Sequence, residues 1–92
     1  MSTESQLALP DELSIANALE WKKRLSDLLQ KEPPLSLNAA ELSRVDTAAI
    51  QLLAAFVIEV KSSNLEFSWV EPSEMLKSTA QRLGMSEYLA LG

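Results

Sequence analysis

The fold of this chain is decided by residues 45–62, which read VDTAAIQLLAAFVIEVKS. Asp46 is typical of a helix N-cap, so we expect a helix over residues 47–62. Within residues 48–58 the only polar side chain is that of Gln51. A helix that packs one side against a sheet normally has a polar back. This helix is therefore more apolar than a helix that packs only one side against a sheet needs to be.

The two sides of this helix have different predicted roles. At about 100° of rotation per residue, the side expected to face a sheet consists of Ala49, Ile50, Leu53, Phe56, Val57 and Val60. The outward side carries no charge before Glu59 and Lys61, and it consists of Thr47, Gln51, Ala55, Ile58 and Ser62, flanked by Ala48, Leu52 and Ala54.

Either other elements of the domain or a partner protein would have to cover this outward face. We favour a partner, because a domain of this size rarely buries a helix on all sides. An uncharged helical face of this extent usually marks an interaction site. The small side chains of Ala54 and Ala55 would let another backbone come close.

Toward the N-terminus the chain alternates between strand and helix patterns. Leu35, Leu37 and Ala39 predict a short strand, and residues 41–45 a connecting segment. Apolar residues at spacings of three and four predict a helix over about 15–31, with Ser14 as its N-cap. An alternating stretch over residues 6–9 predicts a further strand.

Toward the C-terminus the same alternation continues. Ser63 and Asn64 predict a turn, and residues 65–70 alternate as in a strand. A helix is expected over residues 72–83, with Pro72 as its first residue and Gly84 as its terminator. Residues 85–91 form a short apolar tail.

The resulting order, β-α-β-α-β-α with short connections, predicts an α/β fold. We expect a single domain over residues 1–92, with helices packed on a small mixed or mainly parallel sheet and with residues 1–5 frayed. The residues expected to be buried are Leu37, Leu53, Phe56, Val57, Phe67 and Leu83.

Composition narrows the classes of function. The formal net charge of -5 disfavours nucleic acid and anionic membrane surfaces as partners and favours a basic patch on a partner protein. The chain has no Cys and no His, which removes thiol nucleophiles, the commonest zinc ligands and the usual general base near neutral pH. No apolar run reaches the roughly 20 residues that span a bilayer, and the N-terminus lacks the pattern of a signal peptide. We therefore expect a cytoplasmic protein without direct membrane insertion, metal or cofactor.

Thr47 has two compatible interpretations. A hydroxyl at a helix start can cap backbone N–H groups. If Asp46 supplies the cap, the Thr47 hydroxyl is free to point outward. A phosphate on this hydroxyl would add a charge of about -1.5 to -2. The helix N-terminus tolerates such a charge, but binding to an apolar partner surface would be lost.

The residues also resemble a known family. The segments Leu35-Ser36-Leu37-Asn38 and Val45-Asp46-Thr47-Ala48-Ala49-Ile50-Gln51-Leu52-Leu53 resemble the STAS domain, which was first known in bacterial anti-sigma factor antagonists. The family pattern is a short strand, a loop, and Asp-Ser/Thr-x-Gly-Leu opening a helix. The resemblance implies that Thr47 occupies the position phosphorylated by a cognate kinase and that partners bind around it. Two positions depart from the pattern: Asn38 stands where many members have Asp, and Ala49 where many have Gly.

The resemblance is strongest to the small stand-alone STAS proteins of bacterial chemotaxis clusters, and it extends to the STAS subunit of a phospholipid-transport ABC complex. It implies one of three protein partners: a signalling kinase or anti-sigma-like regulator, a chemotaxis component, or an ABC ATPase. Two hypotheses follow, a signalling adaptor switched by phosphorylation and a constitutive subunit that binds the ATPase.

An enzyme is not expected, because the chain has no Gly-rich phosphate loop and its carboxylates are scattered. The predicted partner-binding residues are Asp46, Thr47, Ala48, Gln51, Leu52, Ala54, Ala55 and Ile58, with Thr47 as the phosphoacceptor.

Overall fold

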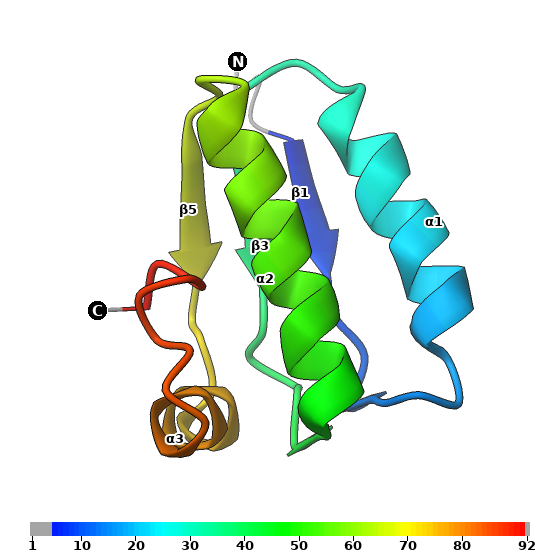
Figure 1. Cartoon of the computed structure of the whole chain (residues 1–92). Helices are drawn as coiled ribbons and strands as arrows, with labels where there is room; N and C mark the ends of the chain where they lie inside the picture. The colour runs from blue at the N-terminus through cyan, green and yellow to red at the C-terminus, as the bar shows by residue number, and fades with distance from the viewer. Residues whose placement is uncertain (1–4, 92) are drawn as a thin grey trace.

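The computed structural model describes residues 5–91, which form an α/β domain (Figure 1). The elements in chain order are β1 (Ser5–Ala8), β2 (Glu12–Leu13), α1 (Ala18–Leu29), β3 (Leu35–Asn38), β4 (Arg44–Val45), α2 (Thr47–Ser62), β5 (Phe67–Val70) and α3 (Glu74–Arg82). The predicted α/β class and the predicted bounds of α2 are confirmed. Of the residues expected to be frayed, 1–4 lie outside the described residues, and Ser5 begins β1.

The main sheet has the strand order β1-β3-β5, and both of its pairings are parallel. Leu37 of the central strand stands between Leu7 and Trp69, and Leu35 stands between Ser5 and Phe67. Side chains alternate between the two sides of a strand, so these residues share one face. That face meets α2, since the rings of Phe56 and Phe67 pack edge to face with centroids 5.7 Å apart.

The core lies between this face and the two longer helices. All six α2 residues predicted to face the sheet are buried, and α1 adds Trp21, Leu25 and Leu28. In Figure 1, α2 lies across the sheet, α1 runs beside it in the same direction, and both helices begin at the end of the molecule where the strands end. Polar side chains that start either helix therefore meet at one end.

Burial agrees with the prediction for Leu37, Leu53, Phe56 and Val57. Phe67 is half-buried and packs against the core. The prediction for Leu83 was wrong, because α3 ends at Arg82 and leaves Leu83 as a C-cap residue that is 41% exposed. The tail contributes Leu89 to the core instead.

A second, two-stranded sheet was not predicted. β2 and β4 pair in parallel, and β4 lies within the stretch expected to be only a connecting segment. The backbone carbonyl of Asp11 supports the pairing, since it accepts hydrogen bonds from the N–H groups of Ser43 (2.8 Å) and Arg44 (3.0 Å). This small sheet fixes the starts of α1 and α2 next to each other.

The other two helices are shorter than predicted. α1 covers residues 18–29 rather than 15–31, because residues 14–17 form a turn closed by the Asn17 N–H on the Ser14 carbonyl (3.1 Å). α3 begins at Glu74 rather than Pro72, because the hydroxyl of Ser73 caps it by accepting from the Leu76 N–H (3.2 Å). Gly84 ends that helix as expected, with a φ of 70° that favours glycine.

Candidate protein-binding site

Asp46 connects the starts of α1 and α2. Its backbone is extended, and its Oδ1 accepts a hydrogen bond from the Ala49 N–H at 2.9 Å, which is the predicted N-cap. Its Oδ2 accepts a second hydrogen bond from the Ile15 N–H at 3.0 Å, across 31 residues of sequence. One carboxylate thus caps α2 and holds the segment that leads into α1.

These two bonds also set the electrostatics of the carboxyl group. The N–H groups of Ile15 and Ala49 lower the pKa of Asp46 from its ordinary value, because both donate to the charged form. The Ile15 N–H has the larger effect. Partial burial opposes this effect to a smaller extent. Asp46 is therefore an ionised acceptor at neutral pH, with both oxygens engaged by backbone donors.

Thr47 is the first residue of α2, and it is exposed. Because Asp46 supplies the cap, α2 does not depend on the Thr47 hydroxyl for capping. An exposed hydroxyl at a helix N-terminus is sterically open to modification, and the positive end of the helix dipole favours an added negative charge there.

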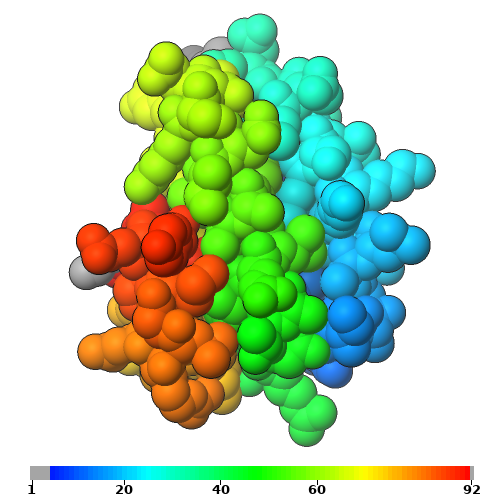
Figure 2. Space-filling model, in the orientation of Figure 1, coloured from blue at the N-terminus to red at the C-terminus, as the bar shows by residue number. Residues whose placement is uncertain are grey.

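Beyond Thr47, the outward face of α2 is open to solvent over most of its length. Gln51, Ala55 and Ile58 are exposed, and Ala48 and Leu52 are half-buried. Figure 2 shows α2 in green at the surface, between α1 in cyan and blue and the C-terminal segment in orange and red. The described part of the chain therefore leaves this face accessible to a partner.

Ala54 does not belong to this face, although the helical pattern placed it at the flank. It is 3% exposed and lies in the core. It follows Ile50 by four residues and precedes Val57 by three, so it extends the buried side of the helix. Ala54 supports the packing of α2 and offers no surface to a partner.

Two apolar residues near the start of α1 were missed by the sequence analysis. Ile15 is 74% exposed and Leu19 is 82% exposed. Both lie outside the buried side of α1, which consists of Trp21, Leu25 and Leu28. The signal was present in the sequence as two large apolar side chains off the helical stripe. Through the Ile15 N–H, this segment is bonded to the residue that precedes Thr47.

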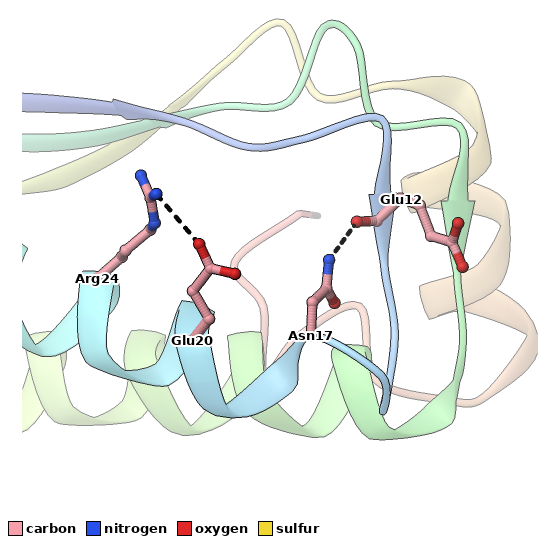
Figure 3. Close-up of polar contacts among 4 residues, drawn as sticks. All are labelled: Glu12, Asn17, Glu20 and Arg24. Carbon is pink, nitrogen blue, oxygen red and sulfur yellow. Dashed lines mark hydrogen bonds and ion pairs between the residues drawn. The ribbon is translucent and has the colours of Figure 1, made fainter.

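The turn that leads into α1 is fixed by side-chain contacts of its own. Figure 3 shows the Asn17 amide donating to the Glu12 carbonyl at 2.9 Å. The Asn17 Oδ1 also accepts from the Ser14 N–H at 2.9 Å. The exposed Ile15 thus lies in a turn held at both ends.

On the helix that follows, Nη2 of Arg24 lies 3.1 Å from Oε2 of Glu20 (Figure 3). The guanidinium carbon of Arg24 also lies over the Trp21 ring, 4.8 Å from the ring centroid.

A shallow groove of about 210 Å³ runs between α1 and α2. Leu52 and Ala55, both predicted as partner-binding residues, form part of its α2 wall, and Leu25 and Leu29 form part of its α1 wall. Gln51 and Ile58 lie on the open face of α2 outside this groove. The candidate site therefore comprises the α2 start, its outward face and the groove beside it.

Neither a metal site nor a membrane-spanning helix occurs among residues 5–91. No group of three carboxylate, imidazole or thiol side chains in that range is placed to hold a metal ion. None of the helices described is long and apolar enough to cross a membrane.

Comparison with known proteins gives a family and two similar structures. The model of the STAS domain matches residues 4–91. The structure of a sulfate transporter family protein from Wolinella succinogenes has a TM-score of 0.77 and 17% identity, over 98% of this chain and 72% of that one. The NMR structure of the protein TM1081 has a TM-score of 0.76 and 20% identity, over 97% of this chain and 73% of that one. No match was found among curated protein sequences.

Proposed function

The chain belongs to the STAS domain family, and from this premise we propose that it is a non-enzymatic protein-binding module of bacterial signalling. In this proposal a partner protein binds the face around the N-terminus of α2, and phosphorylation of Thr47 releases it. The partner is a signalling kinase, an anti-sigma-like regulator or a chemotaxis component.

The single observation that carries the proposal is the exposed, uncharged start of α2. A hydroxyl-bearing residue opens the helix, and the residue before it supplies the cap. Gln51, Ala55 and Ile58 continue the same face without a charge. A partner that covers this face must remove water from Thr47 as well, so a phosphate there would have to be desolvated or expelled.

The experiment compares what the wild-type chain, Thr47→Glu and Thr47→Ala capture from cells that produce the protein. We expect Thr47→Glu to lose the partner, because it places a charge on an uncharged contact face. Thr47→Ala should retain it and should lower the free energy of unfolding by no more than about 1 kcal/mol. Equal recovery with wild type and Thr47→Glu would contradict the proposed binding face.

Phosphosite mass spectrometry on the native protein separates this proposal from its alternative, a constitutive STAS subunit that binds the ATPase of a phospholipid-transport ABC complex. Both predict that Thr47→Glu disrupts binding. The signalling role also requires that a phosphorylated Thr47 is found in cells, under a condition in which the partner is released. A Thr47 that is never phosphorylated while the partner proves to be a transport ATPase would favour the constitutive subunit.

A further inference from the structure

We propose that the groove between α1 and α2 receives an amphipathic helix of the partner protein, and that this helix carries carboxylates along the flank that lies over α1. The inference rests on the proposed protein-binding role and adds the chemistry of the partner. It differs from the expectation drawn from the net charge of -5, which favours a basic partner.

The size of the groove favours side chains of a protein over a small molecule. Its volume of about 210 Å³ is below the roughly 300–1,000 Å³ typical of ligand pockets. The buried side chains of Leu25 and Phe56 contribute to its lining, with Leu29 and Leu52 at its sides. One or two apolar side chains fit such a space. The small Ser26 and Ala55, one from each helix, leave room for a backbone to approach.

The groove continues toward Thr47 along both helices. On α1, Leu19 precedes the lining residues Lys22 and Ser26 by three and seven positions, so it shares their side of the helix. On α2, Ala48 precedes the lining residues Leu52 and Ala55 by four and seven positions. The exposed Leu19 thus extends the apolar path to the phosphoacceptor end. A partner helix with anchors at i, i+3 or i+4, and i+7 matches a path of this kind.

The charge of the α1 wall selects the flank of that helix. Two of the residues that line the groove are charged, Lys22 on α1 and Glu59 on α2. Arg24 is paired with Glu20, whereas Lys22 and Lys23 are exposed and form no ion pair within residues 5–91. Lys22 also lines the groove. The charged residue of the α2 wall is Glu59, which is acidic and would repel carboxylates on that side of the groove. Carboxylates on the flank above α1 therefore complement the wall they meet.

An acidic partner helix would also explain the direction of the proposed switch. Phosphorylation adds a charge of about -1.5 to -2 at Thr47, at the end of the same path. That charge would repel a helix rich in carboxylates and would tolerate one rich in lysines. Release on phosphorylation is then a result of like-charge repulsion as well as of desolvation.

The test uses two synthetic 18-residue peptides, each held helical by a hydrocarbon staple on its solvent side. Both carry Leu at i, i+4 and i+7. They differ on the flank that would lie over α1, where one peptide has Glu and the other has Lys. Each is titrated into the ¹⁵N-labelled wild-type chain at low salt, where charge effects are least screened. We expect the Glu peptide to bind at least about 10-fold more tightly than the Lys peptide, with amide shifts concentrated at residues 19–29 and 48–59.

The variant Lys22→Glu/Lys23→Glu should reverse the preference between the two peptides. Its matched control is Lys77→Glu/Arg82→Glu, which makes the same change in net charge on α3 and should leave the preference as in wild type. Equal affinities, a preference of the wild type for the Lys peptide, shifts outside the groove, or no binding of either peptide would overturn the inference.

A final arm keeps the two proposals apart. Thr47→Glu should weaken the Glu peptide more than the Lys peptide. If the lysine reversal changes the preference and Thr47→Glu has no effect, the groove assignment stands and the switch fails. If Thr47→Glu releases the cellular partner and the lysine reversal changes nothing, the proposed function stands and the acidic helix is wrong.

Discussion

α2 and α3 begin with the same local capping geometry, but only the cap of α2 also bonds to a segment that is distant in the sequence. Each helix begins after an extended residue whose side chain accepts a hydrogen bond from the backbone three residues on: Asp46 from Ala49, and Ser73 from Leu76. The Ser73 hydroxyl makes this one bond within its own helix. The Asp46 carboxylate has a second oxygen, which accepts from Ile15 on the segment before α1.

The exposed faces of α2 and α3 also differ, in the charge that they carry. α3 shows Glu74, Lys77 and Arg82 to solvent, with Glu74 and Lys77 paired at 3.2 Å, as on an ordinary surface helix. α2 shows an uncharged face over its first three turns. In this chain the cap that bonds only within its own helix precedes a charged exposed face, and the cap that joins two elements precedes an uncharged one.

The largest expected effect concerns the difference between the exposed faces of α2 and α3. Ala55→Arg should weaken binding of the partner recovered with the wild-type chain by at least about 2 kcal/mol, because it places an unpaired charge in the contact. Its thermal midpoint should barely move, since Ala55 is exposed. Isothermal titration calorimetry and thermal unfolding measure the two quantities.

Gln81→Arg on the exposed face of α3 is the matched control and should change neither quantity. If Ala55→Arg instead loses stability and binding to the same degree, Ala55 belongs to the core of the domain and α2 is no different from α3.

The second effect compares the two caps. Asp46→Ala should lower the free energy of unfolding by about 2 kcal/mol, because it removes a charged acceptor from two backbone donors. Ser73→Ala should cost about 1 kcal/mol, which is usual for a helix cap. Urea unfolding at neutral pH measures both. Equal losses would mean that the bond from Ile15 adds nothing to stability.

What could be predicted from the sequence was local. The bounds of α2, its cap and its buried side all depend on residues within two turns of one another, so propensity and periodicity were sufficient. Thr47 was found in the same way, as the residue that follows a recognisable cap. The parallel sheet followed from the alternation of strands and helices.

What could not be predicted depended on contacts between distant segments. β2 and β4 have two residues each, too few for an alternating pattern, and they pair across some thirty residues. The bond from Ile15 to Asp46 uses a backbone donor that no pattern reveals. α1 starts later than expected because the Asn17 side chain bonds to Ser14 and Glu12 rather than to its own helix.

A third variant separates the two bonds of Asp46. Asp46→Asn has one acceptor oxygen and an NH2 donor in place of two acceptor oxygens, so when its oxygen caps Ala49 the Ile15 N–H faces a donor and loses its acceptor. We expect a loss of about 1 kcal/mol in the free energy of unfolding. Hydrogen exchange should become faster at the Ile15 amide and stay slow at Ala49. Unchanged exchange at Ile15 would show that the link between α1 and α2 does not depend on the carboxylate.

The smallest effect is the pH dependence that distinguishes the caps. The pKa of Asp46 is lowered in the folded chain, first by the Ile15 N–H and then by the Ala49 N–H. A carboxyl with a depressed folded pKa contributes stability above its unfolded pKa of about 3.9, and that contribution is lost as the pH falls through the folded pKa. The difference in unfolding free energy between wild type and Asp46→Asn should therefore be constant from about pH 7 to pH 5. It should then shrink toward pH 3.

The control is the difference in unfolding free energy between wild type and Ser73→Ala. It should not change over this range, because a hydroxyl does not titrate there. The effects of the remaining carboxyls cancel in each comparison. Urea unfolding at pH 7, 5, 4 and 3 gives both differences. An Asp46 difference that stays constant down to pH 3 would mean that a neutral carboxyl holds α1 and α2 together as well as a charged one, and the contrast between the two caps would then be one of reach alone.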